Sequence, residues 1–423
     1  MKSDNVSPTM CIMPWTGLAT DPSGGIRPCC WMDSITTDKF IGDPKDYKNS
    51  KYLNTVKEQF LNGEYPNTCS RCKLNDTTGM QSKRVRENTE WEKNPSNNWN
   101  KIDELDFSII DLRLSNVCNL GCVMCGPKSS SYIFKESKKY GELAPKHNAI
   151  QQNMLKEYNL DLLNPYTDDQ IDEIIEEIGP NARIYCTGGE PSLVKKTTKL
   201  LEVLVDKGYN ETVTLQFNSN FQTLNQQWFD LLKQFKGDML PSLDGVSKTA
   251  EYIRYPCDWN KVENNLKAFI NECGATWTIK IMPTVSIVSI FGLKDLYKWW
   301  YKDIMENYPL VKERVLNVKN NNIITMRVQV NNRLVRPLYF DIRNFPKYVK
   351  QQAKDDINMI IDTYGKYFQQ PSELIYLTDV LKQLDQEPNK DFSEAVDALE
   401  RFDHIRGTSW RESLPELARY TNA

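Results

Sequence analysis

The chain has 423 residues, of which 40% are hydrophobic and 26% are charged, and its formal net charge is -3. These values are typical of a folded globular protein and exclude a collagen-like or disordered chain. The slightly negative charge provides no overall basic field of the kind that indicates nucleic-acid binding, and it leaves a local basic face open.

The sequence shows neither a targeting signal nor a membrane span. The first ten residues, MKSDNVSPTM, lack the apolar core of a signal peptide. The most apolar stretch, residues 281–293, is too short to cross a bilayer and contains a proline. We therefore expect a cytoplasmic protein with no membrane partner. In that reducing compartment, the eleven cysteines favour metal ligands or buried thiols over disulfides.

Five cysteines lie in the N-terminal segment, at Cys11, Cys29, Cys30, Cys69 and Cys72. A glycine-bearing hairpin is expected between the first and second of them. Paired thiolates of this kind hold either an iron–sulfur cluster or a structural zinc, and the sequence does not separate these two sites. The polar residues 77–106 are expected to form a linker with a short helix.

Strands and helices alternate between residues 107 and 331. Strands are expected at residues 107–115, 182–191, 212–220, 238–245, 276–287 and 322–330, and helices at residues 167–179, 193–208, 223–237, 258–274 and 293–305. The expected N-caps are Thr167 with Gln170, Thr223 with Gln226, and Asp258, and the closing glycines are Gly208 and Gly237.

Six strands that alternate with helices predict an α/β fold with a parallel, right-handedly wound sheet. A complete eight-stranded barrel takes about 250 residues, so we expect a partial (β/α)6 barrel. Amphipathic patterns at residues 355–368, 374–386 and 391–407 predict a mainly helical C-terminal extension. In such sheets the chemistry lies at the carboxyl ends of the strands, where the loops containing TGGEP, NSN and SLDG all follow.

A tight group of cysteines follows the first barrel strand. Cys118, Cys122 and Cys125 have the spacing C-x3-C-x2-C, and the next cysteine in the sequence is Cys186. Four thiolates normally hold a cubane iron–sulfur cluster. Three thiolates would bind three irons and leave the fourth open, as a catalytic metal site does. The alternative is a zinc site completed by Cys186 or a histidine.

The segment CNLGCVMC followed by TGGEP resembles the radical S-adenosylmethionine (SAM) superfamily. This resemblance implies a [4Fe–4S] cluster on Cys118, Cys122 and Cys125, whose open iron is chelated by the amino and carboxylate groups of SAM. It implies reductive cleavage of SAM to a 5'-deoxyadenosyl radical, which abstracts hydrogen from a substrate. Met124 stands where the family often has an aromatic residue near the adenine.

Other positions carry over from the family one at a time. The turn with Gly188, Gly189 and Glu190 resembles the site of the SAM amino group, since a carboxylate pairs with an ammonium. The resemblance assigns the ribose side of SAM to Ser219 and Asn220, and the SAM carboxylate to Ser242 and Arg254. An arginine fork matches a carboxylate, although a surface ion pair is the alternative for Arg254. Asp244 is expected either to cap a turn or to touch the ligand.

The N-terminal segment resembles the auxiliary-cluster modules called SPASM and twitch, in which a first cysteine precedes G-x4-C. Gly24 with Cys29 fits this spacing, and so does Gly25 with Cys30; we favour Cys29. With this choice, the resemblance implies a second [4Fe–4S] cluster on Cys11, Cys29, Cys69 and Cys72. A four-cysteine zinc ribbon is the alternative. The family usually places this module after the barrel, whereas here it comes first.

These observations predict an auxiliary module at residues 1–76, a linker at 77–106, a radical SAM partial barrel at 107–331 and a helical extension at 332–423. We expect a radical SAM enzyme that acts on a peptide or protein and takes its electron from a donor such as flavodoxin or ferredoxin. A nucleic-acid or small-molecule substrate is one alternative, and a non-catalytic iron–sulfur or zinc protein is the other.

Overall fold

The computed structural model describes residues 6–32, 39–77, 81–157, 164–223, 226–274, 276–307, 325–326, 337–368 and 371–421. Contacts between Cα atoms divide the chain into two units. The first unit contains residues 1–115, 161–188 and 194–216, and the second unit contains residues 116–160, 189–193 and 217–423.

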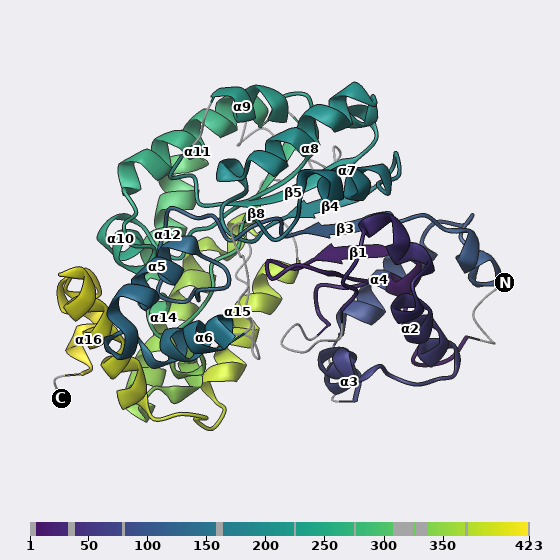
Figure 1. Ribbon diagram of the computed structural model, residues 1–423. Coiled ribbons are helices and arrows are strands. Elements are labelled where there is room, and N and C mark those ends of the chain that lie inside the picture. Colours follow the sequence, from purple (N-terminus) through teal and green to yellow (C-terminus); the bar gives the residue numbers. More distant parts are fainter. Residues whose placement is uncertain are drawn as a thin grey trace. The chain divides into compact units, whose positions relative to one another are not determined.

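The strands of the first unit follow the order β2-β1-β3-β4 (Figure 1). They are β1 (Gly17–Thr20), β2 (Ile26–Arg27), β3 (Ile109–Leu112) and β4 (Arg183–Cys186). β1 and β2 form the expected hairpin, whose turn contains Gly24 and Gly25 at φ 78° and 86°, a conformation that favours glycine. β1 also runs parallel to β3, and β3 runs parallel to β4. The N-terminal segment therefore extends the sheet of this unit.

The predicted boundaries at residues 76 and 106 do not coincide with this division into units. The parallel pairing of β1 with β3 ties the N-terminal segment to the first barrel strand. The four predicted domain ranges stay a prediction.

Helices of the first unit flank these strands. They are α1 (Met13–Thr16), α2 (Lys51–Leu61), α3 (Ser70–Thr77), α4 (Lys83–Glu92), α7 (Asp168–Glu176) and α8 (Lys195–Asp206). α7 begins with the predicted capping box between Thr167 and Gln170, and its isoleucines are buried as the helical pattern required. α8 packs against α7 (Figure 1) and is followed by Gly208 in the left-handed conformation.

Strands of the second unit run parallel in the order β6-β7-β8. They are β6 (Gly237–Pro241), β7 (Trp277–Ile281) and β8 (Thr325–Met326). The remaining predicted strand is β5 (Thr214–Ser219), within which the boundary between the units falls. All six predicted barrel strands are thus present in an α/β fold, although most of the predicted 322–330 strand lies outside the described residues. Gly237 was expected to close a helix; instead α9 ends at Leu232, and Gly237 begins β6, where it pairs with Trp277 of β7.

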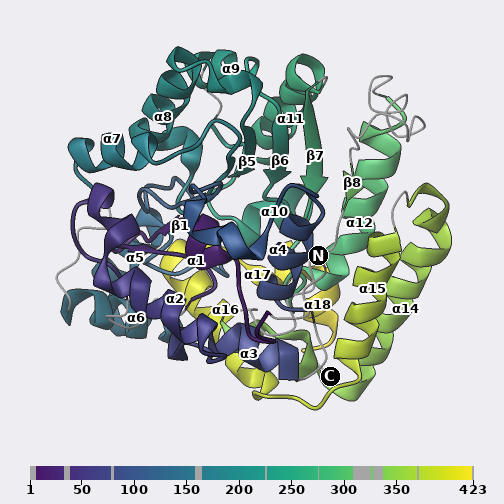
Figure 2. The same ribbon diagram turned by 90° about the vertical axis from the view of Figure 1, so that its right-hand side faces the viewer.

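The helices of the second unit include three predicted in the barrel and three predicted in the C-terminal extension. They are α5 (Ser131–Tyr140), α6 (Lys146–Glu157), α9 (Gln226–Leu232), α10 (Ser247–Ile253), α11 (Trp259–Cys273), α12 (Leu293–Lys298), α14 (Lys347–Tyr364), α15 (Pro371–Leu384), α16 (Phe392–Arg406), α17 (Trp410–Ser413) and α18 (Pro415–Arg419). Asp258 caps α11 as predicted, by accepting a hydrogen bond from the Lys261 N–H. α14 and α15 pack side by side (Figure 2). In the described ranges, no helix has the length and apolarity needed to cross a membrane.

Candidate functional site

The loop with the cysteine triad lies in the second unit and is held by main-chain hydrogen bonds. The Gly121 N–H donates to the Tyr255 carbonyl at 2.5 Å, and the Val123 N–H donates to the Ile253 carbonyl at 2.8 Å. Both carbonyls lie at the end of α10. Because these bonds fix the backbone between the cysteines, the thiols are held in place by the fold.

The surroundings of the three thiols shift their pKa values in different directions. Cys122 is buried, whereas Cys118 and Cys125 are half-buried. A hydrogen bond from the Cys125 thiol lowers the pKa of Cys122 to about 7, burial opposes this shift, and the positive charge of Arg254 adds to it. Burial raises the pKa of Cys118 to about 12. Metal binding requires thiolates, and the hydrogen bond between Cys122 and Cys125, together with the charge of Arg254, favours one thiolate within this pair.

The two glycines before Glu190 are required by the backbone. Gly189 has φ 65°, and a Cβ at this position would lie 2.3 Å from the Val117 carbonyl oxygen. Gly188 has φ 82°, and a Cβ there would lie 3.0 Å from Cβ of Arg113. The Glu190 N–H donates to the Val117 carbonyl at 2.7 Å, one residue before Cys118. The turn at Gly189 and Glu190 therefore packs directly on the cysteine loop.

The structure brings Glu190 together with Ser219 and Asn220. The Glu190 carboxylate accepts hydrogen bonds from the Ser192 hydroxyl at 2.7 Å, the Ser219 hydroxyl at 3.0 Å and the Asn220 N–H at 2.7 Å. Burial raises the pKa of Glu190, and these hydrogen bonds oppose that rise. Nδ2 of Asn220 also lies 4.0 Å from Sγ of Cys118. Glu190 thus joins its own turn to the end of β5 beside the triad.

Arg254 lies beside the triad and is paired with Asp244. Nη2 of Arg254 is 2.6 Å from Oδ2 of Asp244, and Nη1 is 3.7 Å from Sγ of Cys122. Both side chains are largely buried, so this is not the surface ion pair that the sequence left open. Oδ1 of Asp244 accepts a hydrogen bond from the Thr284 N–H at 2.7 Å. Asp244 therefore anchors Arg254 to the loop after β7.

The remaining predicted SAM contacts lie near these groups. The Ser242 N–H donates to the Ser219 carbonyl at 2.8 Å, which places the end of β6 beside the end of β5. Met124 is half-buried between Val123 and Cys125 in the chain. Within the described residues, Nε of Arg254 is buried without a hydrogen-bond partner. Such an orphaned donor fits a group, such as a carboxylate, that binds at this position.

Two side chains near the cysteine loop, Arg406 and His147, were not predicted from the sequence; a Cβ at Gly121 in this loop would lie 3.1 Å from Nη2 of Arg406. Arg406 forms two hydrogen bonds of 2.8 Å with Glu136, and its guanidinium lies 5.0 Å from the ring centre of Tyr255. Nε2 of His147 lies 3.4 Å from the Cys125 carbonyl oxygen, and Nδ1 is hydrogen-bonded to the Tyr339 hydroxyl. The only sequence signal was the rarity of histidine, of which the chain has two.

We expect His147 to make the stability of the protein depend on pH. Burial lowers the pKa of His147 to about 4, whereas an unfolded histidine has a pKa of about 6.5. Between these values the unfolded state binds one proton more, so the free energy of unfolding falls as the pH drops, by as much as about 3 kcal/mol. Urea unfolding gives the free energy of unfolding of the parent and of His147→Gln at pH 7 and at pH 4.5. The loss appears as a change, between the two pH values, in the difference between these two free energies.

The exposed histidine provides the control for that measurement. His404→Gln should keep the pH dependence of the parent, because His404 is exposed on α16. If the free energies of unfolding of the parent and His147→Gln differ by the same amount at both pH values, the conclusion that His147 is buried in its neutral form is wrong.

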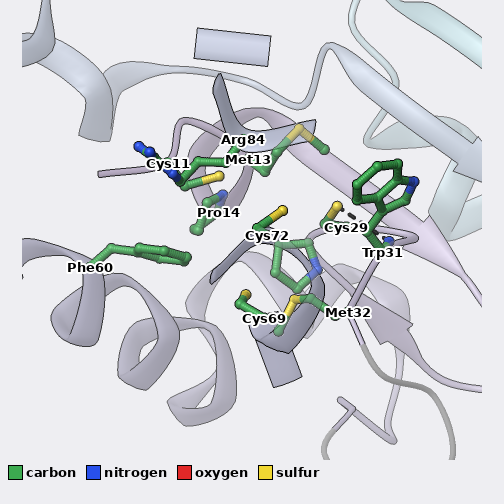
Figure 3. Close-up of a pocket in the computed structure, with 11 residues that line it drawn as sticks. Cys11, Met13, Pro14, Cys29, Trp31, Met32, Phe60, Cys69, Cys72 and Arg84 are labelled. Atoms are coloured by element: carbon green, nitrogen blue, oxygen red, sulfur yellow. Dashed lines mark hydrogen bonds between the residues drawn. The ribbon is translucent and has the colours of Figure 1, made fainter. Parts of the chain in front are cut away.

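Four N-terminal cysteines line one cavity in the first unit (Figure 3). They are Cys11 before α1, Cys29 after β2, and Cys69 and Cys72 around the start of α3. Apolar side chains such as Met13, Met32 and Phe60 complete the wall. The four thiols named by the resemblance therefore meet, although they come from three separate segments of the chain.

Cys30 points to a different environment from that of its neighbour Cys29. Cys30 is absent from the lining of the cavity, and its Sγ accepts a hydrogen bond from Nζ of Lys83 at 3.0 Å. A hydrogen bond from the Cys30 thiol lowers the pKa of Cys29, with burial opposing it. The choice of Cys29 over Cys30 as the ligand stays a prediction.

The donor sets at both sites suit iron–sulfur clusters. In the part of the chain that the structure describes, no group of three or more His, Cys, Asp or Glu side chains is placed to hold a metal ion. The thiolates of a cubane cluster bind separate irons and need not converge on one ion. Three sulfurs with an orphaned arginine donor at one site, and four sulfurs around a cavity at the other, fit such groups.

The comparisons with known proteins include one family match, which spans the cysteine triad and Arg254. Residues 112–288 match the family model of the Radical SAM superfamily. Among curated proteins, isoleucine–tRNA ligase of Acholeplasma laidlawii (strain PG-8A) is 31% identical over 113 residues, which are 24% of this chain and 12% of that protein. The chain thus spans about an eighth of the length of that relative.

Among solved structures, histidine-tagged anSMEcpe with bound AdoMet (SAM) is similar, at 13% identity and a TM-score of 0.35, over 75% of this chain and 95% of that chain. SuiB of Streptococcus suis bound to the precursor peptide SuiA is similar at 14% identity and a TM-score of 0.31, over 70% of this chain and 60% of that chain. At these TM-scores the likenesses carry no argument about activity. The family match alone shows that residues 112–288 of this chain are a radical SAM domain, and thus an enzyme domain.

Proposed function

We propose that the chain is a radical SAM enzyme that cleaves SAM at a [4Fe–4S] cluster held by Cys118, Cys122 and Cys125. One observation carries this proposal: Glu190 and Arg254, the two predicted SAM-binding charges, both lie beside the triad. Arg254 is 3.7 Å from Sγ of Cys122, and Asn220, which is bonded to Glu190, is 4.0 Å from Sγ of Cys118.

The side chains at this site have separate tasks in the proposed reaction. When bound, the cluster and SAM supply a 5'-deoxyadenosyl radical that abstracts hydrogen from the substrate. Arg254, held by Asp244, keeps one buried donor for the SAM carboxylate. Glu190 would accept a hydrogen bond from the SAM ammonium, and Ser219 and Asn220 hold the Glu190 carboxylate in position. The loop bonds at Gly121 and Val123 keep the cysteines fixed during the reaction.

The proposed substrate is a peptide or protein, and the proposed location is the cytoplasm. The net charge of -3 supports a peptide over a nucleic acid, because a nucleic-acid enzyme usually gains affinity from basic side chains. All eleven cysteines are free thiols, which suits a reducing compartment. A second cluster on Cys11, Cys29, Cys69 and Cys72, and an electron donor such as flavodoxin or ferredoxin, belong to the same proposal.

The test of the SAM site is to measure how tightly SAM binds to variants in which Glu190 or Arg254 is replaced. Glu190→Gln and Arg254→Gln should each weaken SAM binding about 10- to 150-fold, because a charge-assisted hydrogen bond contributes roughly 1.5–3 kcal/mol. Equilibrium dialysis with labelled SAM on anaerobically prepared protein measures the dissociation constant, and the cluster absorbance shows whether the iron is retained.

Arg411→Gln is the matched control, since Arg411 is half exposed and pairs with Glu400 on the surface. It should bind SAM as the parent does. Unchanged affinity in both site variants would remove the proposed SAM contacts.

A further inference from the structure

The first unit contains a group of charged side chains that the proposed cofactor sites do not use. This charged cluster consists of Cys30, Lys83, Asp111 and Arg113. Asp111 lies on β3, and Arg113 is the first residue after this strand. Because the two residues are two positions apart, their side chains leave the same face of the strand. Lys83, at the start of α4, donates to Cys30 at 3.0 Å. Lys83 is 8% exposed and Asp111 is 5% exposed.

Asp111 and Arg113 satisfy each other only in part. Nε of Arg113 is 3.4 Å from Oδ1 of Asp111, which is a long contact for an ion pair. Among the described residues, Oδ2 of Asp111 is buried without a hydrogen-bond partner, and burial together with the neighbouring Cys30 thiol raises the pKa of the Asp111 carboxyl. In the same ranges, the hydrogen bonds of Arg113 come from its main-chain N–H and its Nε, and its side chain is 32% exposed, so both Nη atoms are open to a ligand. Buried polar atoms are nearly always paired, so a buried acceptor beside a pair of donors points to a ligand.

The backbone around Arg113 holds this arrangement in place. The Arg113 N–H donates to the Thr20 hydroxyl of β1 at 2.7 Å. Cβ of Arg113 packs against Gly188, where a side chain would come within 3.0 Å. Lys83 supplies a second positive charge, and its bond to Cys30 keeps it occupied. The cluster therefore offers one acceptor and one arginine fork on a fixed strand end.

The position in the sheet is one where ligands bind. Arg113 follows the carboxyl end of β3, and parallel α/β sheets bind their ligands at that edge.

We propose that Asp111 and Arg113 bind the main chain of a peptide substrate. Oδ2 of Asp111 accepts a hydrogen bond from a peptide N–H, and the Nη atoms of Arg113 donate to a peptide carbonyl or a terminal carboxylate. A peptide unit carries one donor and one acceptor, which are the two groups that this pair lacks. A nucleic acid would instead bring phosphates towards a buried carboxylate, which costs free energy. This inference rests on the proposed function and names the substrate class of the same enzyme.

The test uses selection from a random library, because no substrate sequence is needed for it. Full-length protein, prepared anaerobically with its clusters, is used to select binders from displayed random decapeptides and, in parallel, from a random RNA pool. Burial raises the pKa of Asp111 to about 7, so the selection is run at pH 8. Dissociation constants of the enriched decapeptides are then measured for the parent and the variants.

We expect enriched decapeptides whose binding weakens at least about tenfold in Asp111→Asn and in Arg113→Gln, as the loss of one charge-assisted contact implies. Arg113→Lys keeps the charge but loses the fork, and should show a smaller loss. Arg183→Gln is the matched control: Arg183 lies on the neighbouring strand β4 and is already paired with Glu87 at 2.6 Å. It should bind the decapeptides as the parent does.

SAM affinity separates the inference from a general defect, since all four variants should bind SAM as the parent does. The inference is overturned if no decapeptide is enriched, if the variants bind the decapeptides with parental affinity, or if RNA is the ligand that the two substitutions weaken. If the parent binds decapeptides through this pair but forms no 5'-deoxyadenosine from SAM, the proposed function fails and the peptide site stands as a binding site.

Discussion

A variant with Cys118, Cys122 and Cys125 all replaced by alanine should form no 5'-deoxyadenosine from SAM. The three sulfurs are the only cluster ligands that the radical SAM motif supplies, and without them SAM has no open iron to bind. The measurement is anaerobic incubation with SAM and a strong reductant, followed by chromatography of the nucleoside products. Because the reaction depends entirely on the cluster, the expected effect is complete loss.

The control for this experiment removes the same number of thiols elsewhere. A variant with Cys186, Cys257 and Cys273 replaced by alanine should still form 5'-deoxyadenosine, because the resemblance gives these cysteines no ligand role. Two of them are buried in the core, so some loss of stability is expected. Formation of 5'-deoxyadenosine by the triad-free variant at the parental rate would disprove the assignment of the cluster.

Local sequence signals predicted the elements of the fold well. The capping box of Thr167 with Gln170 and the N-cap Asp258 mark the helix starts that the structure has. Such signals depend on residues three positions apart, so they are readable without tertiary structure. The prediction for Gly237 was wrong because a local signal was ambiguous. A glycine can follow a helix or begin a strand, and here its pairing with β7 places it in a strand.

Contacts between distant segments were not predictable in the same way. The parallel pairing of β1 with β3 joins residues about ninety positions apart, and the sequence of neither strand indicates which strand it pairs with. The burial of the Arg254–Asp244 pair likewise depends on where α10 and β6 end in space. The sequence named Arg254 through its family resemblance, whereas the role of Asp244 needed the structure.

The candidate cofactor residues could be predicted, unlike the long-range contacts, because the ends of strands can be recognised in the sequence. Glu190, Ser219 and Ser242 all lie near the carboxyl ends of predicted strands, and parallel strands end at one edge. The structure brings Glu190 and Ser219 into contact at 3.0 Å and bonds Ser242 to Ser219 at 2.8 Å. The contact from His147 to the cysteine loop was not predictable, because it comes from α6, in a segment that the sequence identified only as an insertion.

The triad-free variant also tests the N-terminal site, where we expect a second cluster that survives. Cys11, Cys29, Cys69 and Cys72 line one cavity, and four thiolates complete the coordination of a cubane. The variant should therefore keep about four irons per chain and a reducible paramagnetic signal. Elemental analysis of iron and zinc, together with electron paramagnetic resonance, measures both.

Two neighbouring cysteines offer a matched pair for this prediction. In the triad-free background, Cys29→Ala should lose the iron, because Cys29 lines the cavity, whereas Cys30→Ala should keep it, because Cys30 faces Lys83. The reverse result would make Cys30 the ligand. One tightly bound zinc without iron would show that the N-terminal site is a zinc ribbon. Since Cys11 and Cys29 also belong to the apolar core around α1, loss of the metal should destabilise this segment in either case.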